Sequence, residues 1–294
     1  MKNILITGAG SFVGTGVARW LKAWPEEYHV TTLDMRGEDW KSASFSGYQA
    51  VLHVAGLAHQ KDTKDDPAQL PLYTRVNTDL ALETARKARE AGVGQFLFMS
   101  TESVYGLTAP LGKTVTITKD TPIHPRDNYG ISKARAEEGL LKLAGEGFKV
   151  VILRPPMIYG PGCRGNYPLL SAMAGKLPAF PKVENRRSML YIDNFAECVR
   201  LLIDDEAQGV FCPQNRELVN TGDLIRRIGQ CRGRKILLIP GFTWALRLLR
   251  PFTGAVDKAF GSLCYDRSLS DYPKDYCVKT LEQSIRETEG VAGP

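Results

Sequence analysis

The sequence predicts an α/β protein built on a doubly wound parallel sheet, followed by a smaller C-terminal α/β domain. Three observations lead to this prediction. Short β-branched or apolar runs alternate with longer helical patterns through the first half of the chain, a glycine-rich turn joins the first run to the first helix, and an aspartate ends the second run. Such alternation is typical of a parallel sheet covered by helices on both faces.

Each expected element has its own pattern. Five short apolar runs have the length of buried strands, and three longer segments between them have helical periodicity. The strands are expected at 3–7, 29–34, 49–55, 94–100 and 148–155, and the helices at 13–24, 77–92 and 131–147. Farther on, residues 189–204 have the pattern of one more strand followed by a helix.

Composition predicts an ordinary globular protein. The 294 residues are 43% hydrophobic and 24% charged, which suits one domain or two. The net charge of +6 comes from 38 basic and 32 acidic side chains that are scattered along the chain. We therefore expect no nucleic-acid partner, because an anionic small ligand explains a modest basic excess equally well.

The cysteines and the N-terminal sequence indicate the cellular compartment of the protein. The six cysteines, at 163, 198, 212, 231, 264 and 277, form no C-x-x-C pair and no zinc-like spacing with histidine, so they are expected to be reduced thiols with no metal. The chain starts with a strand pattern in place of a secretory signal, and its apolar runs are shorter than the roughly 18 residues of a membrane span. We expect a soluble, cytoplasmic protein.

One segment stands apart from this expectation. Residues 236–252, ILLIPGFTWALRLLRPF, are apolar and aromatic, with Arg247 and Arg250 available to one helical face. The pattern is compatible with contact to a membrane surface. Because Pro240, Gly241 and Pro251 interrupt it, we predict a helix packed on the C-terminal domain.

The glycine-rich turn TGAGSFVG, from Thr7 to Gly14, has the context of a dinucleotide site. It follows a strand and opens a helix, where glycines let the backbone approach a pyrophosphate and the helix N-terminus attracts anions. The turn contributes six predicted cofactor contacts: Gly8, Gly10, Ser11, Phe12, Val13 and Gly14.

Asp34 ends the second strand pattern and indicates which dinucleotide binds. A carboxylate at this place accepts hydrogen bonds from both adenosine-ribose hydroxyls and repels a 2′-phosphate, which favours NAD. Arg36, two residues later, is suited to receive that phosphate, so NADP stays the alternative. Met35, between them, is included among the predicted cofactor contacts.

A phenol and an ammonium stand four residues apart in NYGISK, as Tyr129 and Lys133. On a helix the two lie one turn apart on the same face. To act as a base near neutral pH, a phenol with a pKa near 10 needs its phenolate stabilised by about 3 units, roughly 4 kcal/mol. Such pairs also occur on amphipathic helices where the phenol packs and the ammonium reaches water, so the pair alone decides nothing.

A series of motifs resembles, in order and over nearly the whole chain, the extended short-chain dehydrogenases/reductases of the NAD-dependent epimerase/dehydratase family, which act on nucleotide sugars. The family's glycine loop reads TGxxGxxG, and Ser11 stands at its middle glycine. The motifs are TGAGSFVG, HVAGLAH, VN at Val76 and Asn77, STESVYG before YGISK, LRPPMIYGPG, RRSMLYIDN and a C-terminal TLEQSIRET.

The resemblance implies a domain organisation and further cofactor contacts. It implies a Rossmann NAD-binding domain over 1–160, to which 188–212 returns, and a sugar-nucleotide substrate domain formed by 161–187 and 213–294. The additional cofactor contacts that it implies are Val54, Ala55, Gly56, Asn77, Tyr129, Lys133 and Pro156.

The resemblance also assigns catalytic roles. Tyr129 takes a proton from a sugar hydroxyl, Thr101 orients the same oxygen, and Lys133 holds the nicotinamide ribose. In the family's dehydratases the hydroxyl residue is followed by Asp-Glu, whereas here Glu102 and Ser103 follow Thr101. A dehydratase is therefore disfavoured, and Glu102 is either an acid or a solvated loop carboxylate.

In the C-terminal half, the resemblance implies a UDP-sugar site. Asn166 and Tyr167 are expected on a loop before a helix, and Arg187 stands where the family has an arginine for the diphosphate. Arg267 is our choice for the second such arginine, and Thr101 is expected to touch the sugar as well. Arginine suits bidentate contacts with phosphate oxygens.

Three activities remain. The leading one is an NAD-dependent 4-epimerase of a UDP-hexose or UDP-N-acetylhexosamine. The second is an NAD(P)H-dependent reductase of a UDP-4-keto-6-deoxy-N-acetylhexosamine. Ala58 favours it, because the family's epimerases have at this position a lysine that helps to retain the cofactor. His59, the next residue, is interpreted as a polar loop residue. The third, a non-catalytic dinucleotide sensor, is disfavoured because the hydroxyl, tyrosine and lysine are all present.

The resemblance leaves a homodimer open and implies a role in polysaccharide precursor synthesis.

Overall fold

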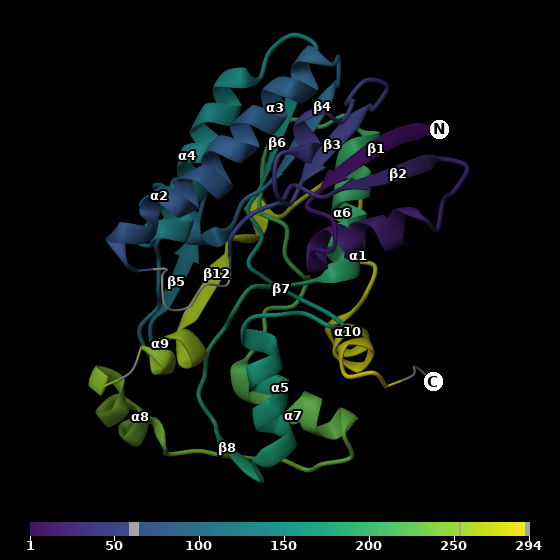
Figure 1. Cartoon of the computed structure of the whole chain (residues 1–294). Helices are drawn as coiled ribbons and strands as arrows, with labels where there is room; N and C mark the ends of the chain where they lie inside the picture. Colours follow the sequence, from purple (N-terminus) through teal and green to yellow (C-terminus); the bar gives the residue numbers. More distant parts are fainter. Residues whose placement is uncertain (59–64, 253, 292–294) are drawn as a thin grey trace. The chain divides into compact units, whose positions relative to one another are not determined.

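The computed structural model describes residues 1–58, 65–252 and 254–291, and the chain divides into two compact units (Figure 1). His59 lies outside the described residues. Within them, no helix has the length and apolar character needed to cross a bilayer. Unit 1 consists of Met1–Gly106, Pro122–Pro155 and Phe195–Pro213, and unit 2 consists of Leu107–Thr121, Pro156–Asn194 and Gln214–Pro294.

Unit 1 contains a six-stranded sheet in the order β10-β6-β4-β3-β1-β2. Every neighbouring pair is parallel, which confirms the α/β fold with a parallel Rossmann-type sheet. All five strands expected in the first half are present. The strands are β1 (Lys2–Thr7), β2 (Tyr28–Leu33), β3 (Ala50–His53), β4 (Gln95–Met99), β6 (Lys149–Leu153) and β10 (Gly209–Phe211).

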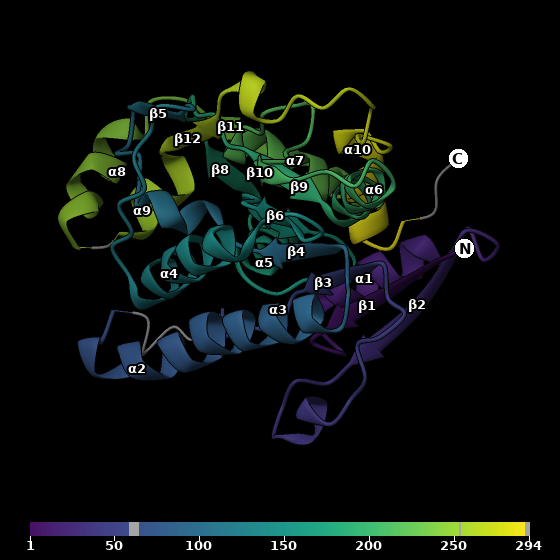
Figure 2. The same cartoon turned by 90° about the horizontal axis from the view of Figure 1, so that it is seen from above.

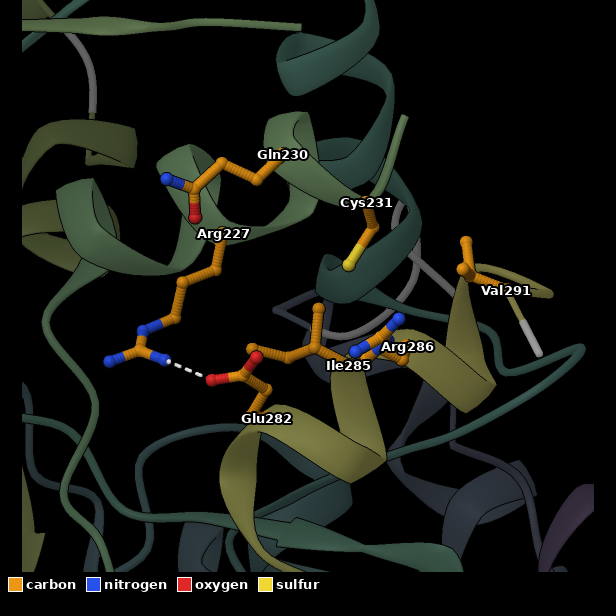
Figure 3. A pocket seen from close by; sticks show the side chains of 7 residues that line it. All are labelled: Arg227, Gln230, Cys231, Glu282, Ile285, Arg286 and Val291. Carbon is orange, nitrogen blue, oxygen red and sulfur yellow. Dashed lines mark hydrogen bonds and ion pairs between the residues drawn. The ribbon is translucent and has the colours of Figure 1, made fainter. Parts of the chain in front are cut away.

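Helices cover both faces of this sheet, as Figure 2 shows. On one face, small and branched side chains of α3 and α4, such as Ala85 and Leu140, pack on strand residues such as Val51 and Phe96. On the other face, Trp20 of α1 donates to Glu197 of α6 at 2.8 Å. The main helices are α1 (Phe12–Leu21), α3 (Leu80–Glu90), α4 (Asn128–Leu143) and α6 (Ile192–Asp204).

Shorter helical turns precede α3 and follow β2 and β4. A π-helical turn, Thr74–Asp79, runs directly into α3, and π-turns inside helices are frequent near functional sites. The others are the 3₁₀ turns Asp39–Lys41, Pro67–Gln69 and Glu102–Tyr105 and the helical turn α2 (Leu70–Tyr73).

The strand order reverses at β1, because β2 lies on one side of β1 and β3 on the other. Thr7 and His53 are register partners at the carboxyl ends of β1 and β3, and the Thr7 hydroxyl is 2.8 Å from Nδ1 of His53. Doubly wound sheets bind ligands at such a reversal point. The glycine turn after β1 and the segment after β3 therefore begin side by side at the expected ligand site.

Unit 2 contains short parallel strand pairs and helices in its described residues. Residues 107–121 belong to it through β5 (Thr114–Ile117), which pairs with β12 (Ser262–Tyr265). The other pairs are β7 (Met157–Tyr159) with β9 (Met189–Tyr191) and β8 (Ala179–Pro181) with β11 (Leu237–Ile239). The helices are α5 (Asn166–Lys176), α7 (Thr221–Cys231), α8 (Thr243–Leu249), α9 (Ala255–Phe260) and α10 (Leu281–Thr288).

The segment 236–252 does not form the packed helix that we predicted. It divides into β11, the short helix α8 and the 3₁₀ turn Arg250–Phe252, and no residue of α8 or of that turn is buried. The interruption at Pro240 and Gly241 explains the division, because proline cannot donate to a strand ladder and Gly241 has a positive φ of 89°. Trp244, Leu248 and Leu249 of α8 are left facing solvent, whereas Ala245 and Leu246 are half-buried.

Candidate active site

The glycine turn after β1 packs closely against the segments that follow β2 and β3. Gly8 and Gly10 have positive φ values of 95° and 76°, a region that favours glycine. A Cβ on Gly8 would lie 2.8 Å from the backbone nitrogen of Ala55. The Gly8 N–H donates to the Leu33 carbonyl at 2.8 Å, so the turn is fixed between the end of β2 and the segment after β3.

Serine is accommodated at position 11, where the family's pattern has a glycine. Its φ is −70°, which any residue adopts, and its Oγ caps α1 by accepting a hydrogen bond from the Gly14 N–H at 3.1 Å. The first turn of α1 carries no acidic side chain. The N–H groups of Phe12 and Val13 have no acceptor within a helix that starts there, so this turn suits an anion such as a pyrophosphate.

Asp34 and Arg36 form an ion pair immediately after β2. Nη2 of Arg36 lies 2.5 Å from Oδ2 of Asp34, and their side chains are 89% and 45% exposed. Hydrogen bonds from Arg36 lower the pKa of Asp34 to about 2, so the carboxylate is ionised at neutral pH. Met35, between them in sequence, is buried with Trp40 and Ala55.

Asn77 fixes the segment after β3 to helix α4. Its buried side chain accepts from the Leu57 N–H at 2.7 Å and donates to Oγ of Ser132 at 2.9 Å. A Cβ on Gly56 would lie 2.9 Å from Oδ1 of Asn77 and 3.2 Å from Nζ of Lys133. The Val54 N–H donates to the Thr7 carbonyl at 3.1 Å. The predicted cofactor residues of this segment are thus held beside Lys133.

Lys133 is buried on α4, with 3% of its surface exposed. Its Nζ donates to the Met99 carbonyl at 2.7 Å and lies 4.5 Å from the centre of the Phe98 ring. Burial lowers the pKa of Lys133 to about 7, while the charge of Glu137 acts in the opposite direction. The ammonium is therefore poised to exchange its proton near neutral pH.

Tyr129 lies one turn before Lys133, as the spacing predicted. The Asp127 carboxylate caps α4 by accepting from the Gly130 N–H at 2.7 Å. Burial raises the pKa of Tyr129 to about 12, although a side-chain hydrogen bond with Thr101 lowers it. The surroundings that the chain itself provides hold Tyr129 as a protonated phenol, so the four-residue spacing does not by itself activate it.

Thr101 and Glu102 begin the 3₁₀ turn after β4. Oγ1 of Thr101 accepts from the Ser103 N–H at 3.1 Å, and the Glu102 N–H donates to the Pro155 carbonyl at 3.1 Å. A Cβ on Gly130 would lie only 2.6 Å from the Ser103 carbonyl oxygen. Gly130, which the sequence analysis missed, thereby lets the Thr101 turn approach α4 beside Tyr129.

A buried ion pair behind Lys133 was also missed. Nη2 of Arg154 lies 2.6 Å from Oε2 of Glu137, and their side chains are 10% and 2% exposed. The Ser100 hydroxyl donates to Glu137, and Nη1 of Arg154 donates to the Tyr105 hydroxyl at 2.9 Å. The pair therefore fixes both ends of the Thr101 turn to α4. A signal existed, because Tyr129, Lys133 and Glu137 repeat at intervals of four residues.

Two predicted substrate residues lie at the start of α5 in unit 2 and not on a loop. Asn166 is the first residue of the helix and is exposed. Tyr167 follows it, is only 2% exposed and stacks on Tyr159 with ring centres 5.1 Å apart. Burial raises the pKa of Tyr167. Pro156, predicted to touch the cofactor, is buried immediately before β7.

The two predicted diphosphate arginines both lie beside β12. Arg187 bridges to Leu263 of that strand, and its Nη1 donates to the Gly261 carbonyl at 3.2 Å. Arg267 follows β12, is exposed, and donates from Nη2 to the Arg216 carbonyl at 2.7 Å. Both guanidinium groups are thus anchored by backbone carbonyls in the same part of unit 2.

The residues of unit 1 fit a bound dinucleotide. The glycine cradle, the uncharged first turn of α1 and the ionised Asp34 lie along the carboxyl edge of the sheet. Among the residues that the structure describes, no cluster of His, Cys, Asp or Glu is suited to hold a metal ion.

Comparison with known proteins gives a consistent result. Residues 4–211 match the NAD dependent epimerase/dehydratase family. A UDP-glucose 4-epimerase of Vibrio cholerae is 30% identical over 98% of this chain and 94% of its own length. An N-acetyl-alpha-D-glucosaminyl-diphospho-ditrans,octacis-undecaprenol 4-epimerase of Escherichia coli O157:H7 is 27% identical over 80% of this chain and 73% of its own.

A reductase and a solved structure complete the comparison. A GDP-6-deoxy-D-mannose reductase of Pseudomonas aeruginosa is 31% identical over 58% of this chain and 57% of its own length. The structure of UDP-glucuronic acid 4-epimerase from Bacillus cereus in complex with NAD has a TM-score of 0.71 at 17% identity, over 98% of this chain and 97% of that one. At that identity the likeness concerns the fold.

Proposed function

This chain belongs to the NAD dependent epimerase/dehydratase family, and we propose that it is an NAD-dependent 4-epimerase of a UDP-hexose or UDP-N-acetylhexosamine. One observation supports this above all others. Thr101, Tyr129 and Lys133 belong to the same unit as the glycine cradle and the ionised Asp34, with Thr101 hydrogen-bonded to Tyr129 and Lys133 beside Gly56. The site thus combines a proton-transfer group with residues suited to a dinucleotide.

The residues of unit 1 would hold NAD at the carboxyl edge of the sheet. The N–H groups at the start of α1 would bind the pyrophosphate, and Asp34 would accept hydrogen bonds from the adenosine ribose. The ion pair engages both Arg36 and Asp34, so the support for NAD over NADP comes from the ionised Asp34, which repels a 2′-phosphate. When bound, NAD supplies the oxidation and re-reduction of the sugar carbon.

Tyr129 would move the proton of the sugar hydroxyl at its Oη, with Thr101 orienting the same oxygen. Its pKa of about 12 must fall by about 5 units, roughly 7 kcal/mol, to reach neutral pH. Lys133 is the nearest buried cation on α4, and it stabilises a phenolate only in its protonated form. The pKa of Lys133, about 7, already includes the charge of Glu137, so the phenolate that forms beside this lysine would itself help to keep the lysine protonated.

We assign the diphosphate of the substrate to Arg187 and Arg267. A guanidinium has five N–H donors, so one bond to a backbone carbonyl orients the side chain without using all of them. The exposed Asn166 is assigned to the sugar nucleotide as well. The buried ring of Tyr167 would act by supporting the start of α5.

A reductase of a UDP-4-keto sugar is the second candidate. Ala58 stands where the family's epimerases carry a cofactor-retaining lysine, and one relative is a GDP-6-deoxy-D-mannose reductase.

We place the enzyme in the cytoplasm, which the six free cysteines support. We also propose a homodimer, which light scattering of the purified protein will test.

The deciding experiment gives the purified protein UDP-galactose or UDP-N-acetylgalactosamine without added NADH. We expect the 4-epimer to accumulate to equilibrium, with Tyr129→Phe as the inactive control. If no epimer forms and NADH is consumed stoichiometrically with a UDP-4-keto-6-deoxy sugar, the reductase is correct. A parallel arm with a polyprenyl diphosphate N-acetylglucosamine asks whether this chain accepts the carrier named for its E. coli relative.

A further inference from the structure

Unit 2 exposes an apolar surface on helix α8 that plays no part in the proposed reaction. We call it the α8 face and define it by Phe242, Trp244, Leu248, Leu249 and Phe252. Trp244, Leu248 and Phe252 are 65%, 64% and 86% exposed. Isolated exposed apolar residues are ordinary, whereas a contiguous group marks an interaction site.

The geometry of the segment keeps these side chains together. Trp244, Leu248 and Phe252 follow one another at intervals of four residues, which places them on one side of a helical segment. In both views α8 and α9 lie together at one end of unit 2, away from α5, α7 and α10 (Figures 1 and 2). Although α9 lies beside α8, the exposed fractions show that Trp244, Leu248 and Phe252 remain open to solvent among the residues that the structure describes.

The charge around the α8 face is predominantly positive. Helix α8, the 3₁₀ turn after it and helix α9 carry the basic residues Arg247, Arg250 and Lys258 and one acidic residue, Asp257. Arg247 is exposed, and Arg250 has an ion pair with Asp257 at 3.0 Å. Exposed tryptophan, phenylalanine and leucine combined with arginine are typical of segments that lie in the interface of a membrane.

The same charge argues against a second copy of this chain as the occupant. A two-fold interface would place the same patch of both copies face to face. Because Asp257 is already paired with Arg250, Arg247 and Lys258 of the two copies would then meet with no other acidic residue of α8 or α9 to separate them. An anionic bilayer surface offers both the apolar layer for Trp244 and Phe252 and the negative charge for the arginines.

We propose that the α8 face docks the protein onto a membrane surface that contains anionic lipid. Trp244, Leu248 and Phe252 enter the region below the headgroups, and Arg247 with its basic neighbours contacts lipid phosphates. The docking does not depend on the proposed activity, and it holds whether the sugar substrate is water-soluble or carried on a lipid.

Co-sedimentation with lipid vesicles tests the proposal. The protein should bind vesicles of phosphatidylethanolamine and phosphatidylglycerol in equal parts, bind phosphatidylcholine vesicles much less, and be released as salt rises. Trp244→Glu combined with Phe252→Glu should weaken binding at least about tenfold, and Arg247→Gln about fivefold, the contribution of one basic residue near an anionic surface. Trp244→Phe should keep binding.

A control is Leu141→Glu, which introduces one of the two negative charges of the double variant, at an apolar position of α4 that is 44% exposed. It should leave vesicle binding unchanged. Epimerisation of a water-soluble nucleotide sugar, measured on each preparation, reports folding independently of docking; near-UV circular dichroism serves the same purpose if no substrate is found.

Three results would overturn the proposal. The first is a native protein that stays in the supernatant with both kinds of vesicle. The second is a folded Trp244→Glu/Phe252→Glu variant that binds as tightly as the native chain. The third is a native dimer that this double variant dissociates without any vesicle binding, which would make the α8 face a subunit interface.

Discussion

The proposed chemical site in unit 1 and the proposed substrate arginines in unit 2 are held in different ways. Lys133 is buried and donates to a backbone carbonyl, and behind it Glu137 and Arg154 form a buried ion pair. Arg267 in unit 2 is exposed and touches only surface backbone in the contacts described above. Rigid support preserves a reaction geometry, whereas an exposed side chain such as Arg267 leaves room for different substrates. Changes in unit 1 should therefore abolish turnover, and changes in unit 2 should alter substrate affinity.

The largest effect should come from Tyr129→Phe. Removing the hydroxyl that moves the proton should lower kcat by about 10³–10⁴-fold, at the upper end of general acid–base contributions. Binding of NAD, measured by isothermal titration calorimetry, should change little, because the phenol is not its main anchor. Near-normal turnover of the variant would mean that another group transfers the proton.

Arg154→Leu should strongly reduce stability, because it leaves the Glu137 carboxylate buried without its cation. Breaking one side of a buried pair costs about 3–5 kcal/mol, which urea unfolding followed by circular dichroism measures. The double variant Arg154→Leu/Glu137→Leu should recover most of this free energy. An Arg154→Leu protein of native stability would show that the pair does not support the Thr101 turn.

Gly130→Ala tests the close approach of the Thr101 turn to α4. The added methyl would meet the Ser103 carbonyl at 2.6 Å, so the turn must move, and a displacement of about 1 Å costs roughly 10²-fold in kcat/KM. Gly145→Ala is the control, because its Cβ would meet nothing within 4 Å. Equal kcat/KM values for both variants would remove the positioning role of Gly130.

Arg187→Gln examines the substrate side of the comparison. We expect KM for the nucleotide sugar to rise about tenfold, or roughly 1.4 kcal/mol, with little change in kcat. Arg186→Gln changes the adjacent, exposed arginine and should leave KM near its native value. Steady-state kinetics of both variants separate diphosphate binding from a general charge effect; identical KM values would contradict our assignment.

Asp34→Ser should leave turnover intact and shift only the cofactor preference. It removes the partner of the ribose hydroxyls and the repulsion of a 2′-phosphate, and it releases Arg36 from its ion pair. The ratio of Kd values for NADP and NAD should fall by about tenfold. An unchanged ratio would identify Asp34 as a turn residue that only fixes Arg36.

The sequence predicted the sheet of unit 1 because local signals coincided there. Buried runs, helical periodicity and the glycine turn each point to the same strand–turn–helix order. Ser11 shows the limit of a motif, since it departs from the family glycine and yet caps α1 in an ordinary conformation. Serine is a preferred N-cap residue, so the sequence alone is compatible with Ser11 at the start of a helix.

Unit 2 was harder to predict for a physical reason. Its strand pairs join short segments that are far apart in sequence, such as Thr114–Ile117 with Ser262–Tyr265, and runs of three or four residues carry little periodicity. The packed helix expected at 236–252 was wrong because the sequence shows amphipathic character but not what covers it. Gly130 was missed because its role depends on a contact with Ser103, which lies in another element.

The central claim, epimerisation at C4 with Tyr129 as the proton-transfer group, is tested most directly by an isotope at the reacting carbon. The purified protein is given UDP-galactose, or the N-acetylated sugar on which it proves active, with deuterium at C4 and no added NADH, and the product is analysed by NMR and mass spectrometry. Our account predicts a 4-epimer that keeps deuterium at C4, formed by the native chain and not by Tyr129→Phe. A product whose C4 deuterium has exchanged with water, or equal turnover by the Tyr129→Phe variant, would contradict it.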